Sequence, residues 1–337
     1  MIVTHQSAAT IGGVLEALTV QLGDGDELVV VDSGSTDGTV DVVRERGAGA
    51  TVVQPGANVG FARGCNLGAE STTAPLLLFL NPDARPEPGC LDALRAIAPD
   101  HPDWGAWQAL VTLDGGTRVN TRGGVVHFLG LAWAGGVGEP VESAPDAPCE
   151  VGFASGAALV VRRAVWERVG GFDPAYFMYG EDVDLALRLR LAGHGVGLAP
   201  AARVEHDYEF DKGARKWYLL ERNRWLTILA VYPAPLLLAL GPALLAAEVG
   251  IAVVAARGGW LGSKLEAQRW LLGHPGEIVR RRRRVQALRT ASAWEFAARL
   301  TADLDSPYLG EAADSRALGS TLGAYWRMAL RALGSRR

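Results

Sequence analysis

Cysteine and lysine are both scarce in this chain of 337 residues. The three cysteines, Cys65, Cys90 and Cys149, are widely spaced and odd in number, which predicts neither a disulfide framework nor a cysteine metal site. So few cysteines are typical of a protein from a reducing compartment. There are only three lysines, so nearly all positive charge is arginine, which we attribute to genomic base composition rather than to function.

A basic charge balance and a dinucleotide-binding glycine motif are also lacking. The formal net charge is −4, whereas nucleic-acid-binding proteins usually present a strongly basic face, so no nucleic-acid partner is expected. No Gly-x-Gly-x-x-Gly follows the first predicted strand, which argues against an NAD-dependent oxidoreductase. The apolar content of 49% and the charged content of 21% instead predict a folded protein with a substantial core.

The amino terminus shows no basic segment followed by an apolar one, so no secretory signal is predicted. Residues 1–4 resemble the end of a strand, and we expect the natural start to lie a few residues upstream. Over the first two hundred residues, short apolar runs at 27–31 and 75–80 alternate with helical patterns at 39–46 and 61–70. This alternation predicts an α/β domain with a mixed, mostly parallel sheet flanked by helices.

The last third of the chain changes in composition and predicts a helical region at residues 216–337. Within 225–256 the only formal charge is Glu248. Residues 236–256 are long enough to cross a bilayer, but Glu248 would be costly in lipid, so a buried hairpin or an interfacial helix is an equal alternative. The arginine run at 280–284 is either a solvated helix face or an anchor for anionic head groups, and its position after the apolar segment favours the membrane.

Two aspartates follow predicted strands directly, at the edge where parallel sheets bind ligands. Asp32 follows the run at 27–31, and Asp83 ends a Leu-Asn-Pro-Asp sequence after the run at 75–80. A divalent cation is held by one or two carboxylates together with substrate phosphates, and Asp83 suits that chemistry. An aspartate in this position is also a common turn former or helix cap, so both interpretations stay open.

A second polar segment lies at residues 58–66. Gly60 allows a close approach of the backbone to a ligand, and Asn58 and Asn66 offer donors and acceptors to a base or ribose. Arg63 could reach a phosphate. A helix that starts here with Asn58 as its cap is an equal alternative.

The strongest local signal is a group of three carboxylates, Glu181, Asp182 and Asp184, after Tyr179. Such close carboxylates raise one another's pKa, which is unfavourable unless the chemistry uses it. One of them can serve as the base for an acceptor hydroxyl. Acidic residues also favour the first turn of a helix, and the two roles are compatible. Further along, His206 could complete a metal shell with Asp83, although a lone histidine is more often structural.

Taken together and in this order, these segments resemble the family-2 inverting glycosyltransferases with the GT-A fold, in particular their rhamnosyltransferase-like and galactofuranosyltransferase-like bacterial branch. The resemblance covers about residues 1–225. Residues 31–37 look like the nucleotide-contacting Val-Asp-Asn-x-Ser-x-Asp, with Ser33 as a departure, and residues 58–66 are similar to Asn-x-Gly-Phe-x-x-Gly-x-Asn. Residues 4–7 match Thr-Tyr-Asn-Ser with two departures, which leaves base selectivity open.

The remaining matches carry the chemistry. Asp83 stands at the end of the family's Asp-x-Asp metal motif, and Asn81 departs from it. Residues 172–182 resemble the acceptor-side motif whose second acidic residue is the base, which implies that role for Asp182. His206 falls where a histidine closes the metal site in the same branch.

The resemblance implies a GT-A catalytic domain at residues 1–215 and a membrane-associating extension at 216–337. Such an enzyme moves a sugar, with rhamnose as a candidate, from a dTDP- or UDP-linked donor to a lipid-linked or cell-envelope glycan. We expect it at the cytoplasmic face of the bacterial cell membrane, as a peripheral or monotopic protein. The implied site comprises Asp182 and Glu181 as catalytic residues, Thr4, Asp32, Asn58, Gly60, Arg63 and Asn66 around the nucleotide, Asp83 and His206 on Mg²⁺ or Mn²⁺, and Tyr179 and Asp184 on the acceptor side.

Other functions fit less well. A sugar nucleotidyltransferase would carry a glycine-rich phosphate loop with a basic residue near the amino terminus, and the glycines at 12–13 lack that arrangement. A catalytically inactive, membrane-associated glycan-binding or scaffolding homologue stays open because His5 and Asn81 depart from the family pattern. The presence of the expected carboxylates and histidine argues against it.

Overall fold

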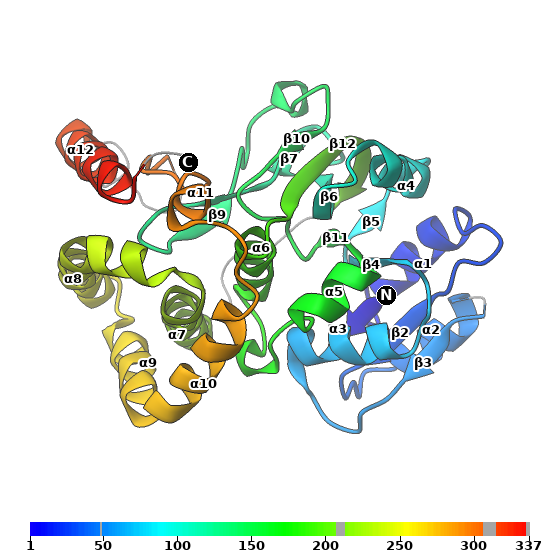
Figure 1. Ribbon diagram of the computed structural model, residues 1–337. Helices are drawn as coiled ribbons and strands as arrows, with labels where there is room; N and C mark the ends of the chain where they lie inside the picture. The colour runs from blue at the N-terminus through cyan, green and yellow to red at the C-terminus, as the bar shows by residue number, and fades with distance from the viewer. Residues whose placement is uncertain (48, 207–212, 306–314, 335–337) are drawn as a thin grey trace. The chain divides into compact units, whose positions relative to one another are not determined.

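The computed structural model describes residues 1–47, 49–206, 213–305 and 315–334 (Figure 1). The chain divides into two compact units, which we describe one at a time. The sheet unit contains Met1–Gly124, Ala134–Leu189 and the segment that starts at His194. The helical unit contains Val125–Trp133, Arg190–Gly193 and the C-terminal helices. The predicted domain bounds, 1–215 and 216–337, stay a prediction.

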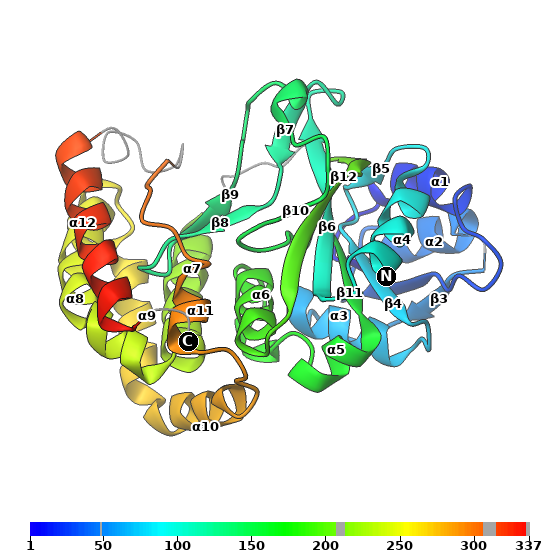
Figure 2. The same ribbon diagram turned by 45° about the horizontal axis from the view of Figure 1, so that its top comes forward.

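The sheet unit is built on a ten-stranded mixed sheet in the order β10-β12-β6-β11-β4-β1-β2-β3, with β5 paired to β12 and β7 to β6 (Figure 2). Pairing is parallel from β4 through β1 and β2 to β3, whereas β11 runs antiparallel to both β4 and β6. The strands are β1 (Ile2–Thr4), β2 (Val29–Asp32), β3 (Thr51–Val53), β4 (Leu76–Leu80), β5 (Arg85–Pro86), β6 (Trp104–Leu113), β7 (Arg118–Thr121), β10 (Cys149–Glu150), β11 (Ala158–Arg162) and β12 (Gly195–Glu205).

Helices flank this sheet, which confirms the predicted α/β class. The pattern at 39–46 coincides with α2, and the predicted strands at 27–31 and 75–80 correspond to β2 and β4. The helical elements of this part of the chain are α1 (Ile11–Thr19), α2 (Thr39–Arg46), α3 (Gly60–Glu70), α4 (Cys90–Asp100), α5 (Arg163–Val169) and α6 (Glu181–Leu191), with 3-10 helices η1 (Val141–Ser143) and η2 (Pro174–Tyr176).

The central strand β4 is covered on both faces, as its continuous apolar sequence predicts. Successive side chains of a strand point to opposite faces. Leu80 belongs to a buried cluster that also contains Leu15 of α1 and Leu94 of α4. Its neighbour Phe79 packs instead against Trp166 of α5, at a ring-centroid distance of 4.8 Å. The loop that follows β4 is therefore anchored to a strand that is packed on both faces.

In its described residues the helical unit contains helices α7 to α12 and the turn of a two-stranded ribbon, which confirms the predicted helical C-terminal region. The ribbon strands are β8 (Gly124–Val126) and β9 (Ala132–Ala134). In the turn between them, the ring of Phe128 stacks on that of Trp326, with centroids 4.9 Å apart. The helices are α7 (Ala214–Val231), α8 (Ala234–Arg257), α9 (Leu261–Gly273), α10 (Pro275–Gln286), α11 (Ala293–Ala297) and α12 (Arg316–Ala332).

The apolar segment and the arginine run both lie on these helices. The segment 225–256 spans the end of α7 and most of α8, and α8 is long and apolar enough to cross a membrane by length and composition alone. The run 280–284 lies on α10, but its side chains do not share one environment. Arg281 is buried, and Arg282 donates to the carbonyl oxygens of Leu229 and Tyr232. Only the other three arginines are exposed.

Candidate functional site

Thr4 and Asp32 end the neighbouring parallel strands β1 and β2 as direct register partners. The Thr4 hydroxyl donates to one Asp32 carboxylate oxygen at 3.0 Å, and the Ser35 backbone N–H donates to the other at 3.1 Å. Both Thr4 and Asp32 are buried. The residue that caps α2 is Gly38, so Asp32 is not the helix cap that its position alone allowed. Its carboxylate is fixed at the sheet edge by these two hydrogen bonds.

The two residues that depart from the family pattern after β1 bridge the loops of β1 and β2. His5 Nδ1 lies 2.9 Å from the Ser33 carbonyl oxygen. Gln6 both donates to the Thr36 hydroxyl and accepts from the Thr36 backbone N–H, at 3.1 and 2.8 Å. Sequence reasoning missed this role, because nothing in residues 4–7 points to partners thirty positions away.

Asn58 precedes α3 and Gly60 is its first residue, as the sequence partly indicated. Asn58 Oδ1 accepts from the Gly60 backbone N–H at 3.0 Å and from the Ser33 hydroxyl at 3.2 Å, while the cap position itself is Val59. Gly60 has φ +76°, and a Cβ there would lie 2.5 Å from the Phe177 carbonyl oxygen. The structure therefore requires glycine at this position for packing against Phe177.

Asn66 and Arg63 lie further along α3 in different environments. The Asn66 amide nitrogen donates to the Phe172 carbonyl oxygen at 2.8 Å, and its amide oxygen accepts from the Phe172 N–H at 3.0 Å. These two bonds tie α3 to the loop that leads to the acidic group. Asn66 thus positions this loop, and the nucleotide contact expected for it from the sequence stays a prediction. Arg63 is exposed on the helix surface.

The three carboxylates of the acidic group lie in the first turn of α6, as their sequence spacing predicted. Asp182 accepts from the backbone N–H of Gly156 at 3.2 Å and from that of Val183 at 2.8 Å. Burial raises the pKa of Asp182, and these hydrogen bonds work against the rise. Glu181 is 7% exposed, and burial together with the neighbouring Asp182 raises its pKa to about 8.

The raised pKa of Glu181 favours its protonated form near neutral pH. The charged form of Asp182 is favoured by its two backbone hydrogen bonds. The Oε2 atom of Glu181 is buried and has no hydrogen-bond partner in the described part of the chain, as suits a protonated carboxyl. Environments that separate two carboxyl pKa values in this way are typical of acid–base sites.

Asp184 is held by contacts within the sheet unit, and the acceptor-side contact expected for it stays a prediction. Its side chain is fully buried, and one oxygen lies 2.8 Å from Arg188 Nε. The other oxygen accepts from the Tyr176 hydroxyl at 3.1 Å. Arg188 in turn donates to the carbonyl oxygens of Val169 and Gly171. This ion pair fixes α6 against the turn that precedes it.

The loop between η2 and α6 has an unusual backbone. Phe177 and Tyr179 have positive φ angles of 62° and 67°, which non-glycine residues seldom adopt and which cluster at functional sites. The Phe177 carbonyl oxygen accepts from the Ala62 N–H at 3.2 Å. The first turn of α3 and the start of α6 are thus joined through this loop, with Tyr179 half-buried in it.

Asp83 and His206 converge from the ends of β4 and β12. His206 Nε2 lies 3.1 Å from Asp83 Oδ1; the imidazole is buried and the carboxylate is 40% exposed. The backbone of His206 is held on both sides, because its N–H donates to Thr112 and its carbonyl oxygen accepts from Asn120. An imidazole nitrogen and a carboxylate oxygen this close fit two adjacent positions on one divalent cation. Among the residues that the structure describes, no group of three or more such ligands occurs.

Comparison with known proteins identifies the family. Residues 1–168 match the sequence model of glycosyl transferase family 2. The chain is 33% identical over 201 residues to an N-acetylglucosaminyl-diphospho-decaprenol L-rhamnosyltransferase of Mycobacterium tuberculosis (strain CDC 1551 / Oshkosh). This aligned region covers 53% of this chain and 66% of the relative. It is 40% identical over 81 residues to the rhamnosyltransferase WbbL of Escherichia coli (strain K12), covering 23% of this chain and 31% of the relative. The chain thus spans less than two thirds of the length of these relatives.

Solved structures share the fold at low sequence identity. Residues 1–349 of S. aureus TarS in complex with UDP superpose with a TM-score of 0.53 at 16% identity, covering all of this chain and 92% of TarS. GalNAc-T7 with UDP, GalNAc and Mn²⁺ gives 0.54 at 14% identity, covering 69% and 47% of the two chains. The GT-A fold expected from the sequence is thereby confirmed. With this fold and the match over residues 1–168, the chain belongs to glycosyl transferase family 2.

Proposed function

We propose that the protein is an inverting glycosyltransferase that moves a sugar, with rhamnose as the first candidate, from a nucleoside-diphosphate donor to a hydroxyl of a lipid-linked or cell-envelope glycan. The family and the names of the two rhamnosyltransferase relatives support the reaction class. One observation carries the mechanism: the hydrogen-bonded Asp182 carboxylate next to the buried, protonated Glu181. A carboxylate held in this state can accept a proton at neutral pH.

The candidate base and the candidate metal ligand belong to the same edge of the sheet. Asp182 accepts from Gly156, and the carbonyl oxygen of the next residue, Ala157, accepts from the Asn81 N–H at 3.0 Å. Asn81 is two residues before Asp83. Because β11 begins where the antiparallel β4 ends, a donor diphosphate near Asp83 and an acceptor hydroxyl near Asp182 would both lie at this edge.

The donor nucleoside, linked as dTDP or UDP, would contact the fixed Asp32 carboxylate with Thr4 behind it. Asn58, Gly60 and Arg63, in the neighbouring segment 58–66, would also contact the donor. Asp83 and His206 would hold Mg²⁺ or Mn²⁺. When bound, the cation supplies neutralisation of the charge that develops on the diphosphate.

In the transfer step, Asp182 removes the proton of the acceptor hydroxyl while that oxygen attacks the anomeric carbon. The bond from this carbon to the diphosphate oxygen breaks, and the nucleoside diphosphate leaves with the electron pair. A single displacement inverts the anomeric centre. Glu181, as a neutral neighbour, leaves the single negative charge on Asp182, and Tyr179 would border the acceptor. The lipid part of such an acceptor would place the enzyme at the cytoplasmic face of the membrane.

The test is the substitution Asp182→Asn, which keeps the shape and removes the base. We expect kcat to fall by about two to four orders of magnitude, because that is the usual contribution of a general base. Donor binding by calorimetry, with a panel of dTDP-, UDP- and GDP-sugars and Mn²⁺, should stay within about twofold of the wild type, because the proposed donor contacts are elsewhere. The exposed Asp41→Asn on α2 is the matched control.

Two results would overturn the proposal. Undiminished turnover in Asp182→Asn would exclude Asp182 as the base. Failure of every sugar nucleotide to bind the folded wild-type protein would favour the catalytically inactive glycan-binding or scaffolding homologue.

A further inference from the structure

Exposed apolar side chains are concentrated in the helical unit. Of the eleven large hydrophobic side chains that are exposed in the described part of the chain, all but Val20 belong to this unit. Exposed apolar side chains gathered in one unit indicate a candidate interaction surface. The exposed large hydrophobic residues of the helical unit are Leu238, Leu245, Val249, Val253 and Val254 on α8, Leu265 and Leu272 on α9, Val279 on α10, and Leu318 and Met328 on α12.

Helix α8 has two distinct faces. Leu236, Leu240 and Leu244 are buried and recur every four residues, and Glu248 continues the same line. The opposite face presents Leu238, which is 82% exposed, together with Leu245, Val249 and Val253. Because Glu248 is the only charged residue between 234 and 256, the outward face carries no charge over nearly the whole helix.

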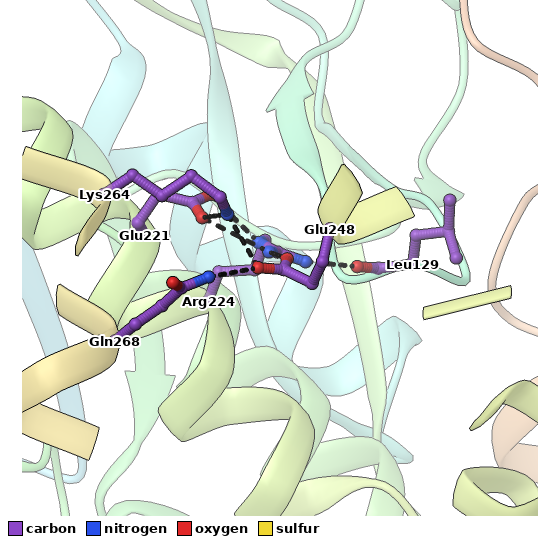
Figure 3. Close-up of polar contacts among 6 residues, drawn as sticks. All are labelled: Leu129, Glu221, Arg224, Glu248, Lys264 and Gln268. Carbon is purple, nitrogen blue, oxygen red and sulfur yellow. Dashed lines mark hydrogen bonds and ion pairs between the residues drawn. The ribbon is translucent and has the colours of Figure 1, made fainter. Parts of the chain in front are cut away.

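Glu248 is bound into a network of four charged side chains (Figure 3). Lys264 Nζ lies 2.7 Å from Glu248 and 2.7 Å from Glu221, and Arg224 contacts both carboxylates. Gln268 adds a hydrogen bond to Glu248 at 2.8 Å. Burial alone would raise the pKa of Glu248, but Arg224 and Lys264 lower it below its ordinary value. The network ties α8 to α7 and α9, so α8 cannot cross a membrane alone without breaking it.

The exposed faces also carry arginines in a regular position. On an α-helix, residues four apart lie on the same face. Three exposed apolar residues are each followed four positions later by an exposed arginine: Val253 by Arg257 on α8, Leu265 by Arg269 on α9, and Val279 by Arg283 on α10. The exposed Glu266 on α9 lies 3.7 Å from Arg215.

We propose that the exposed apolar faces of α8 and α9, with Arg257 and Arg269, form a membrane-docking surface for anionic phospholipid, on which α8 lies in the plane of the interface and does not span the bilayer. Apolar faces bordered by arginine are typical of interfacial helices, in which the basic side chains attract anionic lipid head groups. The inference deepens the proposed lipid-linked acceptor, but vesicle binding needs neither donor nor acceptor, so the two proposals can fail separately.

The test is sedimentation of the full chain with vesicles of phosphatidylcholine alone or mixed with phosphatidylglycerol. We expect binding to the anionic vesicles. The double substitution Leu238→Glu with Leu245→Glu should weaken it by at least about tenfold, because two buried leucines are lost from the interface. Arg257→Glu and Arg269→Glu should each weaken it by at least about fivefold. Val20→Glu, at an exposed valine of the sheet unit, is the matched control and should bind like the wild type.

A circular dichroism spectrum and a thermal unfolding transition like those of the wild type show that each variant is folded. Alkaline carbonate should release the bound wild type, because an interfacial helix is extracted and a spanning one is not. Resistance to carbonate would overturn the in-plane orientation. Absence of binding to the anionic vesicles would overturn the membrane-docking proposal. Self-association in light scattering that the leucine substitutions abolish would also overturn it and would identify a second copy as the occupant.

Discussion

Adjacent carboxyl groups in the first turn of α6 differ in what surrounds them. Asp182 receives backbone hydrogen bonds from Gly156 and Val183, whereas Glu181 is buried with a pKa raised to about 8. The difference favours the charged form of Asp182 and the protonated form of Glu181. An acid whose pKa is raised in the folded state also makes the stability of the protein depend on pH.

Glu181→Gln should remove this pH dependence. The folded protein retains the Glu181 proton up to about pH 8, and the unfolded chain loses it near 4.5. The contribution of the protonated group to stability is therefore complete below 4.5, declines as the pH rises, and is lost through about 8. Glutamine cannot ionise, so the variant should become progressively more stable than the wild type over that range. Urea unfolding at several pH values measures the difference.

The control for this prediction is Glu167→Gln on α5, whose side chain is 63% exposed. Its free energy of unfolding should follow that of the wild type at every pH. Parallel curves for Glu181→Gln and the wild type would contradict a raised Glu181 pKa.

At the residue scale, sequence spacing predicted which candidate side chains converge better than it predicted their partners within the protein. Asp83 and His206 were paired from sequence, and their side chains are 3.1 Å apart. Asn66 and Asp184, for which ligand contacts are predicted, also bind Phe172 and Arg188, and these partners were not foreseen. Short motifs do not name these partners, because a polar side chain near a site looks the same whether it faces a ligand or another segment.

At the scale of elements, α8 shows what composition can and cannot predict. An apolar run with one glutamate left three alternatives open: a spanning helix, a buried hairpin and an interfacial helix. The partners of Glu248 come from α7 and α9, at Arg224 and Lys264, so only the tertiary structure reveals how the charge is balanced. Removing one member of a buried ionic network is strongly destabilising, because it leaves a charge without compensation.

Lys264→Met should therefore destabilise the helical unit by about 3–5 kcal/mol. The lysine is 1% exposed, and methionine fills a similar volume while leaving Glu221 and Glu248 with Arg224 as their shared cation. Denaturant unfolding followed by circular dichroism measures the loss. Glu266→Gln, at a largely exposed ion pair on the same helix, should change stability by at most about 0.5 kcal/mol. Equal effects of the two substitutions would show that the network contributes nothing specific.

At the scale of the whole molecule, local patterns predicted the part of the fold that is built from sequential neighbours. The alternation of strand and helix gave the parallel half, from β4 through β1 to β3. It did not give the antiparallel insertion of β11 between β4 and β6, or the assignment of Val125–Trp133 to the helical unit. Both depend on pairing between distant segments, which periodicity within one segment does not encode.

Binding of the donor, which we assign to the sheet unit, should stabilise the folded protein, and this can be tested at the scale of the whole molecule. A ligand that binds only the folded state stabilises it, by about 2.7 kcal/mol at a free concentration of one hundred times Kd. We expect a nucleotide sugar to raise the thermal stability strongly with Mn²⁺ and weakly with EDTA. Asp83→Asn should remove most of the difference between the two conditions, because it weakens one of the two proposed metal ligands. Thermal unfolding with each donor, with and without the metal, measures this.

The matched control is Lys264→Met, which lowers the starting stability yet alters no proposed donor contact, since Thr4, Asp32, Asp83 and His206 all belong to the sheet unit. Its metal-dependent gain in stability should equal that of the wild type. A gain that persists in Asp83→Asn and disappears in Lys264→Met would place the donor against the helical unit instead. The proposed roles of Asp83 and His206 would then have to be abandoned, whatever the effect of Asp182→Asn on turnover.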